Sequence, residues 1–146
     1  MNKHVEKEYK MLVNKEQFDK LCSLYENLNF ITQTNTYYDT VNGDIQKKKG
    51  AMRIRERNGR FLFTLKMRQE NLDGLCECEC EVSENSIHAL QSEEIVQLLH
   101  EYQIEAAIIP LTTLVTKRAV VETENAELCF DISTYGNHTD YEIEYE

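Results

Sequence analysis

Polar and apolar residues alternate along many short segments of this chain. In Leu75–Val82, written LCECECEV, three glutamates alternate with three cysteines. Because a β-strand directs successive side chains to opposite faces, each such segment predicts a strand with one polar and one apolar face. Eight segments either alternate in this way or are rich in β-branched and aromatic residues: Val5–Val13, Ile31–Asp39, Ala51–Arg57, Arg60–Arg68, Leu75–Val82, Leu111–Glu122, Ala126–Ser133 and Asp140–Glu146.

Two other segments carry apolar residues at helical spacing. Lys15–Leu28 has one apolar stripe that includes Phe18 and Leu21, and Asn14 stands where a side chain caps a helix. Ser86–Tyr102 has a second stripe. We therefore expect two helices among the eight strands.

Two dipeptides predict tight turns between strands. Asn58-Gly59 separates two predicted strands, and Gly136-Asn137 separates the last two. Most strands then follow one another as hairpins, which favours an antiparallel sheet. The pattern predicts an α+β fold in which this sheet can close into a barrel, with the helices packed outside.

The charged residues are segregated by strand. The first, fifth and last predicted strands are rich in carboxylates, and the third and fourth are basic. One interpretation is a sheet with its polar face in water. The other is a closed sheet whose charged face points inward and surrounds a ligand. The residues that share a face are Glu6, Glu8 and Lys10; Arg53, Arg55 and Arg57; Thr64, Lys66 and Arg68; Glu77, Glu79 and Glu81; and Glu142, Glu144 and Glu146.

Composition narrows the class of protein. The 146-residue chain has a formal net charge of -10, which argues against nucleic acid as the main partner because phosphate contacts require a basic surface. The sequence has no apolar run long enough for a bilayer and no signal-peptide core, so we expect one cytoplasmic domain without a membrane partner. Cys76, Cys78 and Cys80 share one face, for which both helix packing and metal binding are possible explanations.

One ordered series of motifs runs from the first predicted strand to the last. It begins with Glu6-Lys7-Glu8-Tyr9-Lys10, a Glu-x-Glu-x-Lys pattern. The motifs that follow are Tyr37-Tyr38-Asp39-Thr40, Met52-Arg53-Ile54-Arg55, Phe63-Thr64-Leu65-Lys66, Thr116-Lys117-Arg118, Phe130-Asp131 and Tyr141-Glu142-Ile143-Glu144. This series resembles the CYTH family, the triphosphate tunnel metalloenzymes. Glu77 departs from it, because many members carry a basic residue there.

The resemblance implies an eight-stranded antiparallel tunnel lined with charged residues, as a single domain over residues 1–146. Relatives often continue into a further helical segment beyond the position of Glu146. Members bind triphosphate-containing compounds and need a divalent metal, usually Mg²⁺ or Mn²⁺. The implied function is metal-dependent hydrolysis of inorganic triphosphate or a small organic triphosphate. The alternatives are a non-catalytic binder of a polyphosphorylated ligand and an adenylate cyclase.

The residues in these motifs suit phosphoryl transfer. Arginine presents a planar fork to phosphate oxygens, and carboxylates are the ligands that Mg²⁺ prefers. If the sheet closes, the first and last strands are neighbours, so we expect the glutamates of the first motif to lie opposite those of the last. The resemblance implies substrate-binding roles for Lys10, Arg53, Arg55, Lys66, Arg68 and Arg118, metal-binding roles for Glu6, Glu8, Glu79, Asp131, Glu142 and Glu144, and catalytic roles for Lys10, Lys66 and Glu8.

Overall fold

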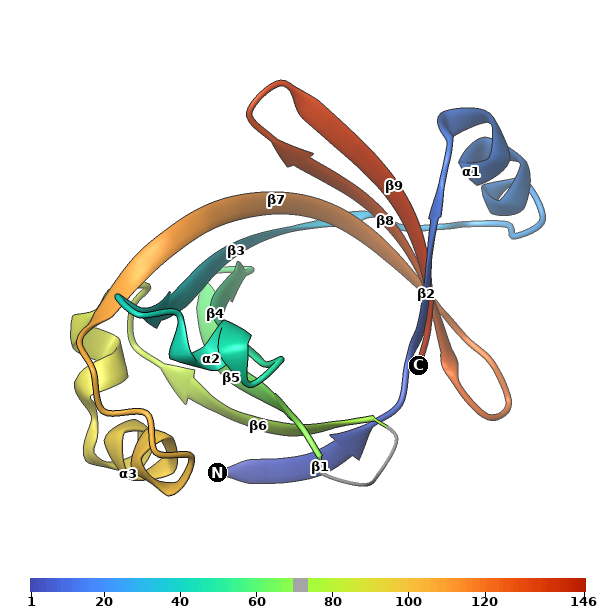
Figure 1. Cartoon of the computed structure of the whole chain (residues 1–146). Helices are drawn as coiled ribbons and strands as arrows, with labels where there is room; N and C mark the ends of the chain where they lie inside the picture. Colours follow the sequence, from blue (N-terminus) through green and yellow to red (C-terminus); the bar gives the residue numbers. More distant parts are fainter. Residues whose placement is uncertain (70–73) are drawn as a thin grey trace. The chain divides into compact units, whose positions relative to one another are not determined.

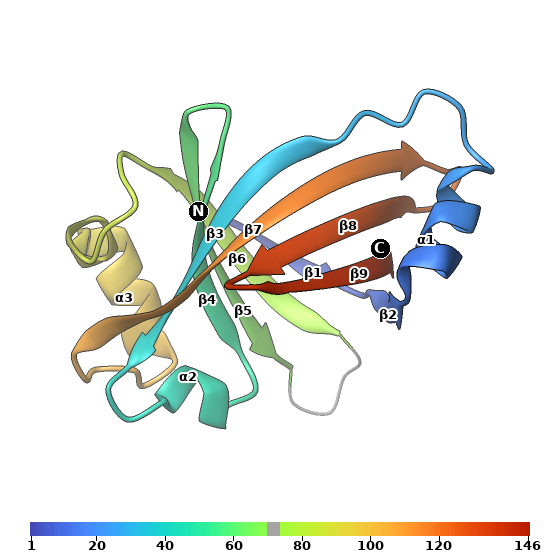
Figure 2. The same ribbon diagram turned by 90° about the horizontal axis from the view of Figure 1, so that it is seen from above.

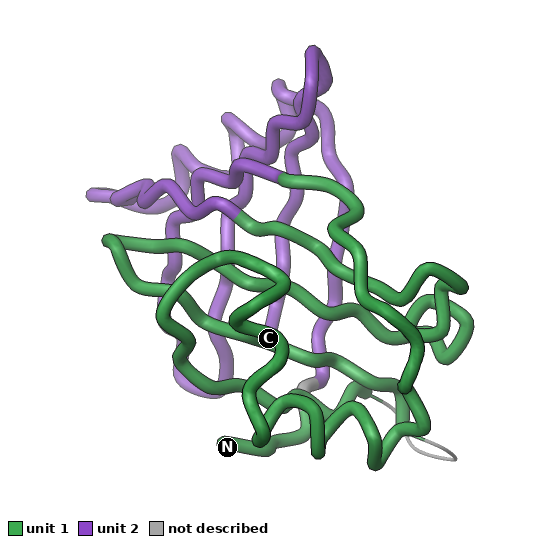
Figure 3. Tube along the Cα trace, turned by 90° about the vertical axis from the view of Figure 1, so that its left-hand side faces the viewer, with its two compact units in different colours: residues 1–6, 35–113 green, residues 7–34, 114–146 purple. Residues whose placement is uncertain are grey.

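The computed structural model describes residues 1–69 and 74–146, which divide into two compact units (Figure 3). Unit 1 comprises Met1–Glu6 and Asn35–Thr113, and unit 2 comprises Lys7–Thr34 and Leu114–Glu146. Two long strands, β3 (Ile31–Thr40) and β7 (Ile108–Glu122), contribute residues to both units. The single domain over residues 1–146 stays a prediction.

Unit 1 contains a sheet in the strand order β1-β6-β5-β4-β3-β7. The hairpin between β4 and β5 turns at Asn58 and Gly59, which both have positive φ, 54° and 74°, as the tight turn requires. The predicted hairpin is therefore confirmed. The elements of this unit, apart from its parts of β3 and β7, are β1 (Asn2–Glu6), α2 (Asp44–Lys47), β4 (Ala51–Arg57), β5 (Arg60–Arg68), β6 (Leu75–Val82), the 3₁₀ helix η1 (His88–Gln91) and α3 (Glu93–Glu101) (Figure 1).

The hydrophobic core of unit 1 lies between this sheet and α3. Ile95 of α3 is buried in one cluster with Ile54 of β4 and Phe63 of β5. Cys78 belongs to the same cluster, and Cys76 and Cys80 pack against it. The cysteines therefore lie on the apolar face, which confirms helix packing. The glutamates that alternate with them belong to the opposite face.

Asp39 has a structural task at the end of β3. The side chain is buried, and its Oδ1 accepts a hydrogen bond from the backbone N–H of Ile45 at 2.9 Å. Its Oδ2 accepts another from the N–H of Gln46 at 3.1 Å. These bonds satisfy donors that the short helix α2 would otherwise leave unpaired. This part of the Tyr37–Thr40 motif thus stabilises the turn between β3 and β4.

Unit 2 contains a sheet in the order β3-β7-β8-β9-β2. Figure 2 shows β7, β8 and β9 side by side, and their pairing is antiparallel. The predicted turn at Gly136 and Asn137 joins β8 to β9, whose residues Tyr135 and His138 are partners. The other elements of this unit are β2 (Tyr9–Val13), α1 (Lys15–Cys22), β8 (Glu127–Tyr135) and β9 (His138–Tyr145).

Helix α1 covers the apolar face of the unit 2 sheet. Asn14 caps it as predicted: its side chain accepts from the Gln17 N–H at 2.7 Å, and the Gln17 side chain accepts from the Asn14 N–H at 3.0 Å. Phe18 is buried with Phe130 and Ile143. The helix ends at Cys22 rather than at the predicted Leu28.

The early end of α1 has a local cause. After Cys22 the hydrogen bonds tighten to a three-residue spacing, from the N–H of Leu24 to the carbonyl of Leu21 and from that of Tyr25 to Cys22. Asn27 then adopts a positive φ of 61°, which the helix cannot accommodate. The apolar stripe therefore continues through turns instead of a helix.

Two other sequence predictions are corrected in detail. The helix expected over Ser86–Tyr102 is interrupted at Ser92, whose extended backbone and side chain cap α3. The strand expected over Val5–Val13 is two strands, because the chain changes partners at Lys7 and Glu8. Residues before the break pair with β6, and residues after it pair with β9.

The strand count is therefore nine rather than eight. The described strands form an antiparallel arrangement with helices on the apolar faces, which confirms the predicted class. The hydrogen-bonded order begins at β1 and ends at β2, which are the two halves of the first predicted strand. Within the same residues, no helix is long and apolar enough to cross a membrane.

Candidate functional site

Arg118 organises the polar face of unit 2. It lies opposite Asp131 in the β7–β8 pairing, and Asp131 lies opposite Glu142 in the β8–β9 pairing. The Arg118 guanidinium donates to both carboxylate oxygens of Asp131, each at 2.7 Å, and to Glu144 Oε2 at 3.1 Å. All three charged groups are largely shielded from solvent. Alternation along three strands thus builds a buried charge cluster.

Lys10 joins this cluster from β2. It lies opposite Glu144 in the β2–β9 pairing, and its Nζ is 3.0 Å from Glu144 Oε1 and 3.6 Å from Glu142 Oε2. Burial disfavours the ammonium charge, but the two glutamates overcome this effect and raise the pKa of Lys10. Lys10 therefore remains a cation over the physiological range.

The two glutamates of β9 differ in acidity. Burial acts to raise the pKa of Glu144, but Lys10 and Arg118 outweigh it and lower that pKa to about 2. Burial raises the pKa of Glu142, which Lys10 offsets only in part. Glu144 is therefore the more firmly ionised carboxylate of this face.

Three carboxylates gather at the end of β9. One oxygen each from Glu8, Glu144 and Glu146 lies within 4.8 Å of the others. This spacing and hard oxygen chemistry suit a Mg²⁺ or Mn²⁺ ion that also keeps several waters. Glu146 was not among the predicted ligands, although it continues the alternation of Glu142 and Glu144.

Unit 2 also buries an amide that lacks partners. Gln33 of β3 is 2% exposed, and neither its Oε1 nor its Nε2 has a hydrogen-bond partner among the described residues. Two residues on, in the part of β3 that belongs to unit 1, Asn35 is also buried. Buried amides without partners are uncommon, and strain, a catalytic role or a bound water or ion accounts for them. The polar alternation of Gln33 and Asn35 was the signal in the sequence.

In unit 1, Glu77 connects a basic strand to β1. Glu77 lies opposite Lys66 in β5 and opposite His4 in β1. Lys66 Nζ is 3.5 Å from Glu77 Oε2, and His4 Nε2 is 3.1 Å from Glu77 Oε1. The sequence pattern assigned no role to His4 or Glu77. Their proximity depends on pairing between β1 and β6, which alternation alone does not specify.

The next row of the same face contains Arg53, Thr64 and Glu79, which are partners across β4, β5 and β6. Thr64 is 1% exposed and its Oγ1 has no hydrogen-bond partner among the described residues, and the same holds for the buried Nε of Arg53. Arg55 donates from Nε to Asn35 Oδ1 at 2.7 Å. This face therefore presents cationic and hydroxyl donors in adjacent rows.

The predicted site residues divide between the units. Glu6 belongs to β1, and its side chain lies outside the described part of the chain. We expected this residue opposite the last strand, but its backbone pairs with β6 instead of β9. Glu8 lies between strands and near Glu144. Arg68 is exposed at the end of β5. Unit 1 contains Arg53, Arg55, Lys66, Arg68 and Glu79, and unit 2 contains Glu8, Lys10, Arg118, Asp131, Glu142 and Glu144.

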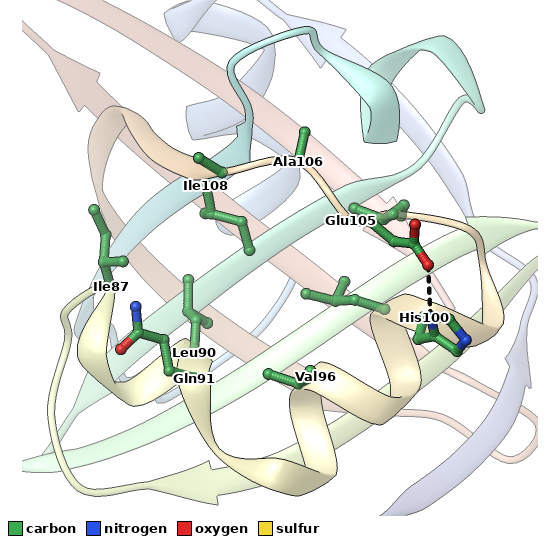
Figure 4. Close-up of a pocket in the computed structure, with 11 residues that line it drawn as sticks. Ile87, Leu90, Gln91, Val96, His100, Glu105, Ala106 and Ile108 are labelled. Carbon is green, nitrogen blue, oxygen red and sulfur yellow. Dashed lines mark ion pairs between the residues drawn. The ribbon is translucent and has the colours of Figure 1, made fainter.

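A cavity of about 290 Å³ lies elsewhere in unit 1, between α3 and the segment that leads into β7 (Figure 4). Ile87, Leu90, Val96 and Ile108 line it, and an ion pair between His100 and Glu105 stands at one side. The lining includes no lysine or arginine. Its chemistry does not suit a polyphosphate.

Comparison with known proteins gives consistent matches. A family model described as the CYTH domain matches residues 4–146. The chain is 36% identical to the Bacillus subtilis (strain 168) protein named "Putative triphosphatase YjbK", over 100% of this chain and 79% of that protein. A crystal structure from Bacillus halodurans, described as a "putative adenylate cyclase", is 34% identical with a TM-score of 0.89, covering 100% of this chain and 82% of that one.

A more distant structure shows the same fold. It is a Hippeastrum protein described as a "putative adenylyl cyclase" with a dominant triphosphatase activity. The identity is 24% and the TM-score is 0.72, over 94% of this chain and 77% of that chain. At this identity the likeness concerns the fold alone.

Proposed function

The chain belongs to the CYTH domain family, and on that premise we propose that it is a divalent-metal-dependent hydrolase of a triphosphate-containing small molecule. The relative of 36% identity named as a triphosphatase supports this assignment. The observation that carries the proposal is the polar face of unit 2, where Arg118, Asp131 and Glu144 are largely shielded from solvent and the half-exposed Lys10 contacts Glu144. A sheet face open to solvent would not shield the charges of Arg118, Asp131 and Glu144.

The carboxylates of unit 2 are the proposed metal ligands. Glu8, Glu144 and Glu146 have oxygens close enough to share one ion, and Glu142 is the neighbouring carboxylate of β9. Asp131 is a weaker candidate because both of its oxygens accept from Arg118. A bound Mg²⁺ or Mn²⁺ would neutralise phosphate charge and orient water. Which ion the protein uses is part of the proposal.

The basic residues are the proposed phosphate ligands. In unit 1, Arg53, Arg55 and Lys66 donate from one face, and Arg68 extends this row to the end of β5. In unit 2, Lys10 and Arg118 supply the positive charge. Fixed cations of this kind stabilise the charge that spreads over phosphate oxygens during transfer.

Lys10, Lys66 and Glu8 are the proposed catalytic residues. The pKa of Lys10 is raised, so it acts as a permanent cation beside phosphate oxygens and does not serve as a proton donor. Lys66 forms an ion pair with Glu77, which orients the Lys66 ammonium group. Glu8 would help to hold the ion, and the proximity of its carboxylate to those of Glu144 and Glu146 supports this role.

A cyclase is the second candidate, because the Bacillus halodurans relative carries that description. A cyclase uses the same triphosphate and metal groups but directs a ribose hydroxyl to the α-phosphorus. A non-catalytic polyphosphate binder is the third candidate. The products of the reaction distinguish the three.

One assay tests the proposed function. The full chain is incubated with inorganic triphosphate, ATP or thiamine triphosphate, with Mg²⁺, Mn²⁺ or chelator, and phosphate and cyclic nucleotide are measured. We expect phosphate release from at least one substrate, and only with metal. Cyclic AMP as the main product would favour the cyclase, and tight binding without turnover would favour the binder.

Replacement of Arg55 by alanine should weaken substrate binding. Charge-assisted hydrogen bonds contribute about 1.5–3 kcal/mol each, so we expect KM or Kd to rise by about one to two orders of magnitude. The control is Arg57→Ala, because Arg57 is an exposed arginine of the same strand. Titration calorimetry with triphosphate measures both. Equal effects of the two substitutions would remove Arg55 from the site.

A further inference from the structure

We propose that His4, Glu77 and Glu79 form a further cation site, built from unit 1 alone, that takes a divalent transition metal ion such as Zn²⁺. One ligand atom from each residue lies within 4.8 Å of the others. The proposal goes beyond the function proposed above: Glu79 is among the metal ligands expected from the family resemblance, but His4 and Glu77 are not, and no step of hydrolysis uses them.

Strand pairing explains why these residues meet. β1 and β6 are antiparallel partners, with His4 opposite Glu77 and Asn2 opposite Glu79. Alternation then places Asn2 and His4 on one face of β1. Lys3, on the other face, forms an ion pair with Glu101 of α3 at 3.6 Å. His4 and the two glutamates therefore lie on the face turned away from α3 and the buried cysteines.

Thr64 gives independent support for a ligand at this place. It is the partner of Glu79 in the β5–β6 pairing. Lys66, two residues further along β5, contacts Glu77, so Thr64 and Lys66 lie on the same sheet face as the two glutamates. Thr64 is 1% exposed, and its hydroxyl has no hydrogen-bond partner among the described residues. Burial of a hydroxyl without a partner is unfavourable. A water molecule bound to the ion would supply that partner.

The donor set indicates the class of ion. An imidazole nitrogen with two carboxylates suits Zn²⁺, Mn²⁺ or Co²⁺, whereas Mg²⁺ prefers oxygen ligands and retained water. The exposure of His4 leaves its ring accessible to an incoming ion. Lys66 Nζ lies 3.5 Å from Glu77 Oε2 and offsets part of the negative charge, which lowers the affinity for a cation. Two carboxylates still face this one ammonium group, so the site keeps a net negative charge.

Binding of metal alone tests the site in the full chain. Protein freed of metal by chelator is titrated with Zn²⁺ and, separately, with Mg²⁺, and the stoichiometry is measured by calorimetry and equilibrium dialysis. We expect His4→Ala to lose one Zn²⁺ equivalent, or to weaken its Kd at least about tenfold, with Mg²⁺ binding unchanged. Thr64→Val should weaken Zn²⁺ binding by a smaller factor.

The control is His138→Ala. His138 is an exposed histidine that contacts a carboxylate, Asp140, at 3.0 Å, but it belongs to no such group among the described residues. Zn²⁺ should also shift the ring resonances of His4 and leave those of His138 unchanged. Zinc binding that His4→Ala leaves intact, or that both substitutions reduce equally, would overturn the proposal.

This experiment is independent of phosphate release. If the chain binds Zn²⁺ through His4 but releases no phosphate, the proposed function fails and the cation site stands. If it hydrolyses triphosphate with Mg²⁺ and shows no His4-dependent zinc binding, the proposed function stands and the cation site fails.

Discussion

Replacement of Arg118 by methionine should lower the free energy of unfolding by about 3–5 kcal/mol. The substitution leaves Asp131 buried without the arginine that binds both of its oxygens, and it removes one of the two cations that contact Glu144; the two carboxylate side chains are only 6% and 7% exposed. An unpaired buried carboxylate pays its desolvation cost without compensation, which makes the loss large. Chemical denaturation at neutral pH in chelator measures it.

A matched control separates burial from charge. Arg60 contacts Glu81 at 2.9 Å, but both side chains are largely exposed. Water screens such pairs, so Arg60→Met should lower the free energy of unfolding by at most about 1 kcal/mol. Equal losses in the two variants would mean that the Arg118 cluster contributes no more than a surface ion pair.

Replacement of Glu144 by glutamine should reduce metal-dependent phosphate release by about one to two orders of magnitude. The amide oxygen can still coordinate a metal ion, but the side chain no longer carries the negative charge that attracts a divalent cation. It also loses its ion pairs with Lys10 and Arg118. The control is Glu124→Gln, because Glu124 is an exposed glutamate in the turn between β7 and β8.

Glu144→Gln should also change how the free energy of unfolding depends on pH. The pKa of Glu144 is about 2 in the folded protein, below its ordinary value of 4.5. A depressed pKa stabilises the folded state above about pH 4.5 and loses this contribution as the pH falls towards 2, on the order of 3 kcal/mol in total. Glu144→Gln should therefore be less stable than the wild type at pH 7, and the difference should shrink below pH 4.5.

Denaturation curves at several pH values check the linkage. A constant difference between the wild type and Glu144→Gln from pH 7 to pH 2.5 would contradict it. Activity should be compared only where both proteins are folded, so that loss of phosphate release reports the site and not unfolding.

Local alternation predicted the central strands well. β4, β5 and β6 begin and end at the expected residues, because the period of two is uninterrupted and Asn58-Gly59 fixes the first hairpin. The predictions that were wrong concern segments whose structure depends on residues that are close in space but distant in the sequence. The strand expected over Val5–Val13 changes partners, and only the pairing with β6 and β9 reveals this.

The types of residue in the candidate site could be predicted from the sequence, but the contacts among them could not. The sequence identified Arg118, Asp131 and Glu144 as functional candidates, yet the register of β7, β8 and β9 decides that Arg118 binds both acids. Partners such as His4 and Glu77 were missed for the same reason. Their proximity is a property of register between distant strands.

The exchange of partners between β1 and β2 has a consequence for synthesis. β2 is translated well before β9, its partner strand, with which it pairs from Tyr9 opposite Tyr145 to Val13 opposite Tyr141. Until it docks, β6 and β9 each expose unpaired backbone groups that other chains can bind. Because such long-range pairing is slow, these strand edges stay open to other chains at least until β9 has been translated, which makes the partly synthesised protein prone to aggregate.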